Sequence, residues 1–558
     1  MAFVNFFVLG LDGATLDIIK PMVEAGKLPA FSMMMSTGVW GELESTVLPV
    51  TPPAWSSFMT GKNPGKHGVY GFFETMLDSY ETSFVTSHSI KAKKIWDYFD
   101  KDKKIALVDI PLTYPPQQVN GCMISGMPVP SKESIFTFPP DLHTELIAQI
   151  GPYMIDNELR KHASEGTLNA LQHLYDYTEM RMKAVRYLIK KLNPINFFMV
   201  VLRGSDFIQH AAFKYLDEDY AKRHPHEAKK YGNIIFQFYE KLDSYLQEIL
   251  KLIGIGGTLI VMSDHGCGPL KRFFYINRWL KQEGFLTLKT NVSFKKQTVE
   301  IRKKPIETLM ERVGLPFINS LLPDFIKRKN LPYIVPKQRH PSNFIDWQKT
   351  SAYANLTWTD GVIRINLKGK QPNGCVKPED YNAICTSIVN KLRDLVDPLT
   401  NKKVMEAVYK KEEIYHGPYL EDAPDIIALT SNIEYAYRVD IFGDELFETP
   451  EDPSPATHRM NGIFMMRSTH TKTGVNLTKH SIMDIAPTIL YLMGVPIPDD
   501  MDGVIIKDAI EYGFLAKHKP SYYKEEDSGQ VQKAANGSFD EEERKEVEEN
   551  LRNLGYLS

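Results

Sequence analysis

Carboxylate and imidazole side chains follow short apolar runs in this sequence. Asp12 comes directly after the run of residues 4–11, and Asp264 and His265 follow the run of residues 258–262. Adjacent Asp and His side chains on a turn can reach one metal ion, and this mixture of oxygen and nitrogen ligands suits zinc or manganese. Taken singly, each segment also fits a structural role as a turn or a helix cap. Together they indicate a metal site.

A second set of such residues comprises Asp206, His210 and His458. Asp206 and His210 stand four positions apart, one helical turn, so both side chains reach the same point if a helix begins there. The alternative is a helix cap with a surface histidine. Because Asp206 also follows an apolar run, we expect it to lie beside Asp12 at one edge of a sheet.

The sequence TPPAW at residues 51–55 places a hydroxyl at the start of a helix-forming segment. As structure, Thr51 fits a turn or the N-cap of a helix over residues 54–59. As chemistry, a hydroxyl at a helix N-terminus has backbone N–H donors beside it that can bind an anion. The two roles are compatible, because both place Thr51 at the start of a helix.

Alternating strand and helix patterns must position these residues. The β-then-α alternation predicts an α/β fold with a largely parallel central sheet covered by helices on both faces. In such sheets the chemistry gathers beyond the carboxyl ends of the strands, where Asp12, Asp206 and Asp264 are expected. The predicted strands span residues 4–11, 105–110, 196–202 and 258–262, and the predicted helices span residues 15–25, 171–190 and 231–252.

Changes of composition divide the chain into four segments. A segment rich in Lys and Arg is interpreted either as a lid over an anionic substrate or as a solvated helical insertion. The polar tail ends in a predicted helix with Val547, Leu551 and Leu554 on one stripe, which we expect to dock on the core. The segments are residues 1–286 (first part of the core, with a helical insertion at about 130–195), 287–345 (basic insertion), 346–515 (late strands and return to the core) and 516–558 (polar tail with a C-terminal helix).

Further short motifs accompany these residues. They are DG at 12–13, TGKNPGKHG at 60–68, DHG at 264–266, INLKG at 365–369 and MDIAPT at 483–488. On these motifs, which span most of the chain, the sequence resembles the type I phosphodiesterase and nucleotide pyrophosphatase branch of the alkaline phosphatase superfamily, particularly its predicted phosphohydrolase/phosphomutase group. The resemblance implies an alkaline-phosphatase-like core with helical insertions. It also implies a phosphoric ester hydrolase that uses two divalent metal ions, with zinc favoured and manganese as the alternative.

The resemblance assigns the ligands of both metals. One metal would be held by Asp12, Thr51, Asp264 and His265, and the second by Asp206, His210 and His458. Coordination lowers the pKa of a hydroxyl much as it lowers that of bound water, from about 16 to about 7, which would make Thr51 a nucleophile. The expected reaction passes through a phosphothreonine that water then hydrolyses at the second metal.

Substrate contacts are less defined. Many phosphodiesterases of this branch carry Asn three residues after the nucleophile, where this chain has Ala54. Enzymes that favour monoesters usually place a cation against the non-bridging oxygens, whereas a diester site needs an apolar slot, which Trp55 or Trp358 would build. The sequence leaves monoesters and diesters open. The candidate phosphate contacts are Lys62, Arg203, Asn355 and Arg459.

Three other functions use the same architecture. Sulfatases share the architecture, but they need Cys or Ser at the nucleophile position for conversion to formylglycine, and Thr51 excludes that. A metal-dependent phosphomutase of the phosphoglycerate mutase type would use the same two metals, with Ser as its usual nucleophile. A catalytically inactive anion-binding protein of the same fold is the alternative from another class, and turnover that depends on Thr51 would exclude it.

Composition limits the partners. In 558 residues, 66 Lys and Arg face 69 Asp and Glu, so no large positive field exists to gather nucleic acid. The four cysteines form no CxxC pair, which argues against a disulfide scaffold or a thiolate zinc site and favours a cytoplasmic location.

The sequence contains no apolar stretch of about 20 residues, so we expect no membrane span. The expected partner is a small phosphorylated substrate, and the sequence does not indicate an oligomeric state.

Overall fold

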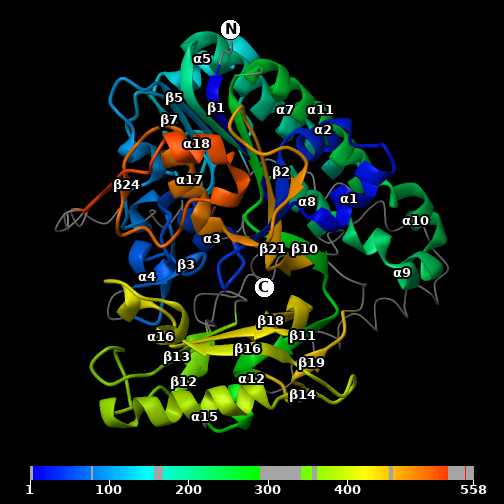
Figure 1. Ribbon diagram of the computed structural model, residues 1–558. Coiled ribbons are helices and arrows are strands. Elements are labelled where there is room, and N and C mark those ends of the chain that lie inside the picture. Colours follow the sequence, from blue (N-terminus) through cyan, green and yellow to red (C-terminus); the bar gives the residue numbers. More distant parts are fainter. Residues whose placement is uncertain are drawn as a thin grey trace.

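The predicted first strand lies near the middle of a sheet with ten described strands in the computed structural model (Figure 1). β1 (Val4–Leu11) pairs in parallel with β8 (Ile195–Leu202) on one side and with β9 (Thr258–Met262) on the other. Both faces of these strands are covered, which explains why the runs are apolar almost throughout. The structure describes residues 4–76, 79–155, 167–254, 256–289, 341–354, 361–450 and 456–525, together with residue 547.

The centre of the sheet is parallel, as predicted, and an antiparallel strand pair flanks it on each side. β5 (Ile105–Ile110) continues the parallel arrangement between β8 and β6, whereas β21 runs antiparallel to β9. Because β1, β8 and β9 are parallel neighbours, their carboxyl ends meet at one edge. The strand order is β22 (Val475–Asn476), β2 (Val39–Glu44), β21 (Asn461–Arg467), β9, β1, β8, β5, β6 (Gly121–Ser125) and β7 (Thr137–Phe138), and β23 (His480–Ser481) pairs with β2.

Helices cover both faces of this sheet. Side chains alternate along β1, so that Phe7 packs in the hydrophobic cluster on one face and Phe6 in the cluster on the other. The predicted helices over residues 15–25, 171–190 and 231–252 all form. Three helices of the Phe7 face are α1 (Leu16–Glu24), α7 (Thr167–Leu192) and α11 (Ile234–Ile253), and two of the Phe6 face are α3 (Thr51–Thr60) and α17 (Ile485–Leu492).

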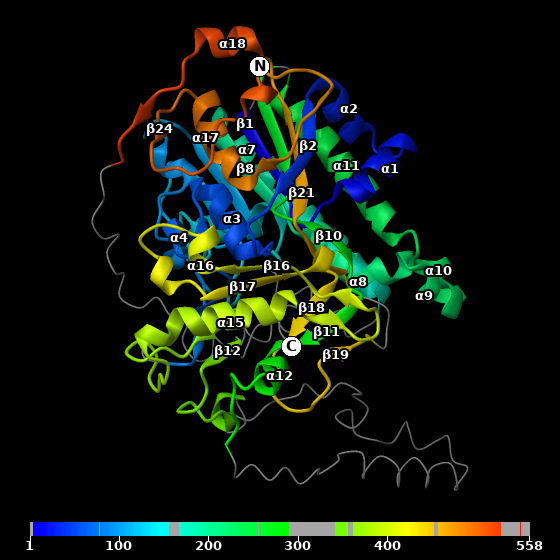
Figure 2. The same ribbon diagram turned by 60° about the horizontal axis from the view of Figure 1, so that its bottom comes forward.

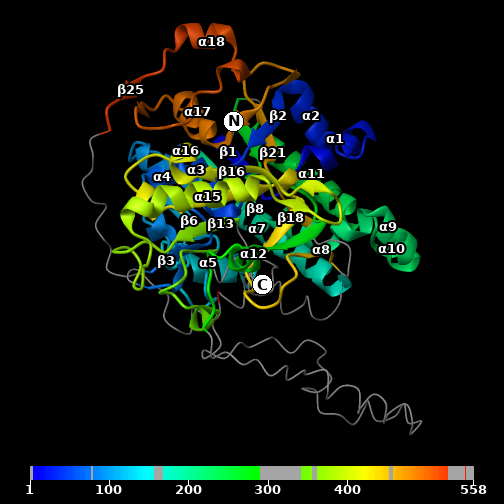
Figure 3. The same ribbon diagram turned by 90° about the horizontal axis from the view of Figure 1, so that it is seen from below.

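A smaller lobe with its own hydrophobic cluster lies across the carboxyl end of the large sheet, as Figure 2 and Figure 3 show from two directions. Trp279, Ile363 and Ile388 are buried in this cluster. Several of the late strands expected within residues 346–515 form here, in a separate sheet. The lobe includes α12 (Ile276–Gln282), β12 (Ala352–Ala354), β13 (Val362–Ile365), α15 (Tyr381–Arg393), β16 (Met405–Lys410) and β17 (Ile426–Thr430).

The chain then returns to the large sheet through β20 (Ala456–Arg459) and β21. Most of the basic insertion, residues 290–340, lies outside the described residues, as do Leu551 and Leu554 of the predicted C-terminal helix. Val547 is described and packs in a cluster with Phe72, Phe84 and Met127. Within the described part of the chain, no helix is both long and apolar enough to cross a bilayer.

Candidate metal centre

The carboxyl ends of β1, β8 and β9 bring three aspartates together. Asp12 follows β1, Asp206 lies just after β8, and Asp264 lies just after β9, and all three side chains are fully buried. The Asp12 N–H donates to Leu202 O, which ties the end of β1 to β8. Gly13 has a φ of +67°, and a Cβ there would lie 2.9 Å from Asp206 Oδ1. Glycine after Asp12 therefore lets two carboxylates approach each other closely.

Asp12, Asp264 and His265 form the first ligand group. One ligand atom from each lies within 4.8 Å of the others. His265 Nε2 lies 3.7 Å from Asp12 Oδ1 and 3.5 Å from Asp264 Oδ2. His265 Nδ1 lies 2.9 Å from Gly266 O, which can only accept, so Nδ1 carries the proton of the neutral ring. The lone pair of Nε2 therefore faces carboxylate oxygens, an arrangement that a cation would stabilise.

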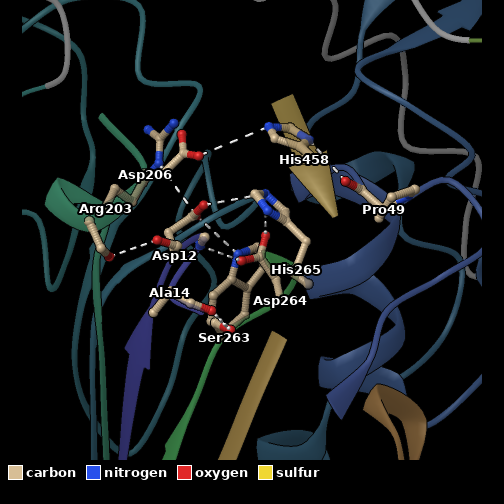
Figure 4. A network of polar contacts seen from close by, with 12 residues as sticks. Asp12, Ala14, Pro49, Arg203, Asp206, Ser263, Asp264, His265 and His458 are labelled. Carbon is tan, nitrogen blue, oxygen red and sulfur yellow. Dashed lines mark hydrogen bonds and ion pairs between the residues drawn. The ribbon is translucent and has the colours of Figure 1, made fainter. Parts of the chain in front are cut away.

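Asp206, His210 and His458 form the second ligand group, which adjoins the first (Figure 4). Asp206 and His210 lie one turn apart on α8 (Gly204–Ala212), and His210 Nε2 is 3.2 Å from Asp206 Oδ1. His458, on β20, places its Nε2 3.3 Å from that of His210 and donates from Nδ1 to Pro49 O over 2.9 Å. The His458 ring stacks on that of His265 with centroids 3.8 Å apart. The two groups thus share one buried site.

Thr51 is the first residue of α3, and Val50 is its N-cap, so the alternative role of Thr51 as a side-chain cap is wrong. Two neighbours on the chain connect it to both ligand groups: Pro49 accepts from His458, and Trp55 Nε1 donates to Asp12 Oδ2 over 3.3 Å. The Thr51 hydroxyl is buried, and it has no hydrogen-bond partner among the described residues. It is therefore free to react or to bind a metal.

The backbone around Thr51 corrects another expectation. A helix N-terminus normally presents free N–H groups to an anion. Here the next two residues are Pro52 and Pro53, which have no N–H, and the Ala54 N–H donates to Val50 O. Of the free backbone N–H groups expected to bind phosphoryl oxygens at this helix N-terminus, only that of Thr51 itself remains.

Burial and mutual repulsion make the first ligand group unfavourable without a cation. Burial raises the pKa of Asp264 to about 8, and the negative charge of Asp206 adds to the effect. Burial likewise raises the pKa of Asp12, and the charges of Asp264 and Asp206 add to it. A bound dication would reverse both shifts by stabilising the ionised forms.

In the second group, burial opposes ionisation of Asp206, but the neighbouring imidazoles of His210 and His458 outweigh it and lower the pKa of that carboxyl. Burial also opposes the charged form of His210, but Asp206 outweighs it and raises the His210 pKa. Burial and the nearby His265 ring lower the pKa of His458, which keeps this ring neutral, the form that binds metals.

The hydrogen bonding of the four ligand atoms assigned to the first metal indicates whether such an ion fits. Each is buried and has no hydrogen-bond partner within the described ranges, although buried polar atoms are normally paired. Their donor set of two carboxylates, an imidazole and a hydroxyl suits zinc or manganese. The residues therefore fit a divalent ion. The atoms are Asp12 Oδ1, Thr51 Oγ1, Asp264 Oδ2 and His265 Nε2.

Serine and glutamine side chains around the ligands were not predicted as part of the site. Ser205 Oγ donates to Asp12 O over 2.6 Å, and Gln209 Nε2 donates to Gly13 O over 2.9 Å. Ser263 Oγ donates to Ala14 O over 2.7 Å, as Figure 4 shows. These bonds fix the turn that carries Asp12. The sequence holds one signal for them, because Ser precedes Asp in both the 205–206 and the 263–264 pair.

The residues proposed to contact substrate are dispersed. Arg203 is fully buried with its Nε 3.8 Å from Asp12 Oδ2, so it belongs to the carboxylate cluster. Lys62 lies beyond the far end of α3, about 15 Å along the helix from Thr51, and forms an ion pair with Asp500. The structure therefore does not bring Lys62 to the site.

The side chain of Arg459 is engaged by the main chain. Its guanidinium donates to Pro269 O over 2.6 Å and to Ile433 O over 2.9 Å, which ties β20 to neighbouring segments. Arg459 therefore has a structural position beside the metal ligands. Asn355 and Trp358 lie outside the described residues.

Comparison with known families fits this geometry. The family model for type I phosphodiesterase / nucleotide pyrophosphatase matches residues 6–440. The chain belongs to this family. The resemblance read from the sequence is thereby confirmed, and the protein is a member of a family of phosphoester hydrolases. His458 lies beyond the matched residues, and the structure supplies its place.

Several solved structures are similar to this one. Human ectonucleotide pyrophosphatase / phosphodiesterase 5 has 13% sequence identity and a TM-score of 0.46, with 92% of this chain and 99% of that chain covered. Phosphonoacetate hydrolase from Sinorhizobium meliloti 1021, in complex with phosphonoacetate, has 15% identity and a TM-score of 0.49, with 88% and 96% covered. Alkaline phosphatase PafA has 11% identity and a TM-score of 0.47, with 91% and 99% covered. No curated protein matches the sequence.

Proposed function

We propose that the protein is a two-metal-dependent phosphoester hydrolase that works through a phosphothreonine at Thr51. The observation that carries this proposal is the set of four buried, unpartnered ligand atoms on Asp12, Thr51, Asp264 and His265, within the part of the chain that the structure describes. A buried hydroxyl without a partner is costly to keep unless a bound species completes it.

The side chains have distinct tasks in this reaction. When bound, two dications would neutralise the phosphoryl oxygens and lower the pKa of the Thr51 hydroxyl. Thr51 Oγ1 forms a bond to phosphorus while the ester oxygen leaves. Water then attacks the phosphothreonine, breaks the Oγ1–P bond and restores the hydroxyl. Gly266 O and Pro49 O orient His265 and His458, so that both rings present Nε2 to the centre.

We propose diesters as the preferred substrates. A monoester carries an additional negative charge that a Lys or Arg would have to meet. Two of the cations expected there, Lys62 and Arg459, are committed to Asp500 and to main-chain carbonyls. Arg203 stands against Asp12, whose charge it offsets. The membership in the type I phosphodiesterase family supports the same preference.

The test is a hydrolysis assay with protein that has been stripped of metal and reloaded with Zn²⁺ or Mn²⁺ in turn. We expect metal-dependent turnover of bis-p-nitrophenyl phosphate, with slower turnover of p-nitrophenyl phosphate. Thr51→Ser, which keeps a hydroxyl, is expected to retain turnover, and Thr51→Ala to lose it. Full metal occupancy without turnover of any phosphate ester would contradict the proposal, as would normal rates in Thr51→Ala.

A further inference from the structure

A pocket lies between the core and the smaller lobe. One wall comes from the hairpin of β3 (Phe73–Thr75) and β4 (Thr82–Phe84), and the opposite wall comes from β12 and β13 of the smaller lobe. In Figure 1, β3 lies at the lower end of the core and faces the lobe that holds β13. No metal ligand lines this pocket.

One residue that lines the pocket, Tyr353, has a buried hydroxyl that nothing in the described chain satisfies. Tyr353 on β12 is only 4% exposed, and its hydroxyl has no hydrogen-bond partner among the described residues. Tyr353 lies directly opposite Arg364 in the antiparallel register of β12 and β13, so both side chains lie on the same face of that sheet. The guanidinium of Arg364 is held by Asp422 O over 3.3 Å and by Ala423 O over 3.4 Å. A hydroxyl donor and a fixed cation therefore stand together in one wall.

The remaining wall is aromatic and well supported. Tyr80 stacks on Trp347 with centroids 3.6 Å apart and an interplanar angle of 7°. Tyr70 donates from its hydroxyl to Tyr419 O over 2.6 Å, which fixes the ring at the pocket. Phe73 lines the same space. Flat, immobilised rings of this kind bind another planar ring at little entropic cost.

The position of the pocket connects it to the nucleophile. Tyr70 and Phe73 belong to two different hydrophobic clusters, and Val50 packs against both of them. Val50 is the N-cap of α3 and directly precedes Thr51. The hydrophobic clusters that include the pocket residues Tyr70 and Phe73 thus extend to the residue before Thr51.

We propose that this pocket binds a planar aromatic ring that carries an anionic or hydrogen-bond-accepting group. The ring lies among Tyr70, Phe73 and Tyr80, and its acceptor receives hydrogen bonds from the Tyr353 hydroxyl and the Arg364 guanidinium. Such a ring comes either from the organic group of a substrate ester or from a separate small molecule. The binding proposal itself does not depend on turnover.

The test uses 4-hydroxybenzoate as the probe and isothermal titration calorimetry on the full-length protein. We expect saturable binding, with cyclohexanecarboxylate binding more weakly because it lacks a planar ring. Tyr353→Phe removes one neutral hydrogen bond and is expected to weaken binding by about 2- to 10-fold. Arg364→Met removes a charged donor and is expected to weaken binding by about 10-fold or more.

Thermal stability separates this role from a structural one. Tyr353→Phe is expected to keep or raise the Tm without ligand, because it deletes a buried hydroxyl that has no partner. Tyr437→Phe is the matched control: it loses a 2.9 Å hydrogen bond to Ala428 O in the same lobe, so it should lower the Tm and leave probe binding unchanged. Absence of binding, or equal binding by wild type, Tyr353→Phe and Arg364→Met, would overturn the proposal.

A competition assay distinguishes the two sources of the ring. If the pocket holds the organic group of a substrate, 4-hydroxybenzoate competes with bis-p-nitrophenyl phosphate and raises its KM. If the pocket serves a separate ligand, the probe binds with the same dependence on Tyr353 and Arg364 and leaves KM unchanged. Binding without any hydrolysis would reject the hydrolase proposal alone, whereas hydrolysis without probe binding would reject the pocket proposal alone.

Discussion

Replacing Asp264 with Asn is expected to stabilise the metal-free protein, although it removes a proposed metal ligand. Burial raises the pKa of Asp264 from 3.8 to about 8, so between these pH values the folded chain holds a proton that the unfolded chain has lost. Stability therefore falls as the pH rises through this window, by up to about 1.4 kcal/mol per pH unit. Above pH 8 the cumulative cost approaches about 6 kcal/mol, an upper limit because water and backbone relaxation reduce it. Asn keeps the acceptor for the Gly13 N–H, at 3.2 Å, without the charge.

The assay is urea unfolding of chelator-stripped protein between pH 5 and pH 9. We expect the free energy of unfolding of the variant to exceed that of the wild type by several kcal/mol as the pH rises. Added Zn²⁺ should make the wild type the more stable protein, because only the wild type binds the ion fully. Asp17→Asn, at an exposed position in the first turn of α1, is the control and should show no such gain. Parallel pH profiles for wild type and Asp264→Asn would refute the view that the buried carboxylates require a cation.

Three further substitutions test separate parts of the site. Thr51→Ala should retain both metals, measured by elemental analysis, and lose about 10³-fold or more in kcat, with no covalent phosphoenzyme on rapid quenching. His458→Ala should reduce the metal content from two ions to one and lose most turnover, since Asp206 and the remaining ligands cannot close the second site. Trp55→Phe keeps the ring packing but removes the donor to Asp12, so metal affinity measured with a competing chelator should fall about 10- to 100-fold.

The central strands of the core were predictable because each is a continuous apolar run in the sequence. The runs at residues 4–11, 105–110 and 258–262 coincide with β1, β5 and β9, since strands buried on both faces are apolar almost throughout. The smaller lobe was not predicted as a unit. β12 and β13 have only three and four residues, and their pairing, rather than their composition, places them in a second sheet.

The clustering of the candidate metal ligands was predictable for a different reason. Asp12, Asp206 and Asp264 each follow a parallel strand, and topology alone brings such positions to one edge. The contacts that orient these ligands were not predictable, because they join segments that are remote in sequence. Pro49 O and His458 Nδ1 are 409 residues apart, and no local pattern marks a carbonyl that will face an imidazole. Lys62 does not lie with the other candidate site residues, because its proximity to Thr51 in sequence ignores the length of α3.

The two prolines after Thr51 limit how the site can bind a negatively charged substrate. Pro52 and Pro53 fix the φ angles of the first helical turn, which holds Thr51 rigidly, but they remove two backbone donors that would otherwise bind a phosphoryl group. The negative charge of the substrate must therefore be met by something other than the helix N-terminus. The three aspartates and three histidines of the site cannot neutralise a negatively charged substrate alone. The raised pKa of Asp12 and of Asp264 shows that even these carboxylates lack sufficient positive charge around them. Under the proposed two-metal function, such a site gains an affinity for anions only when divalent ions are bound, and we therefore predict that metal loading is required for substrate binding as well as for the chemical step.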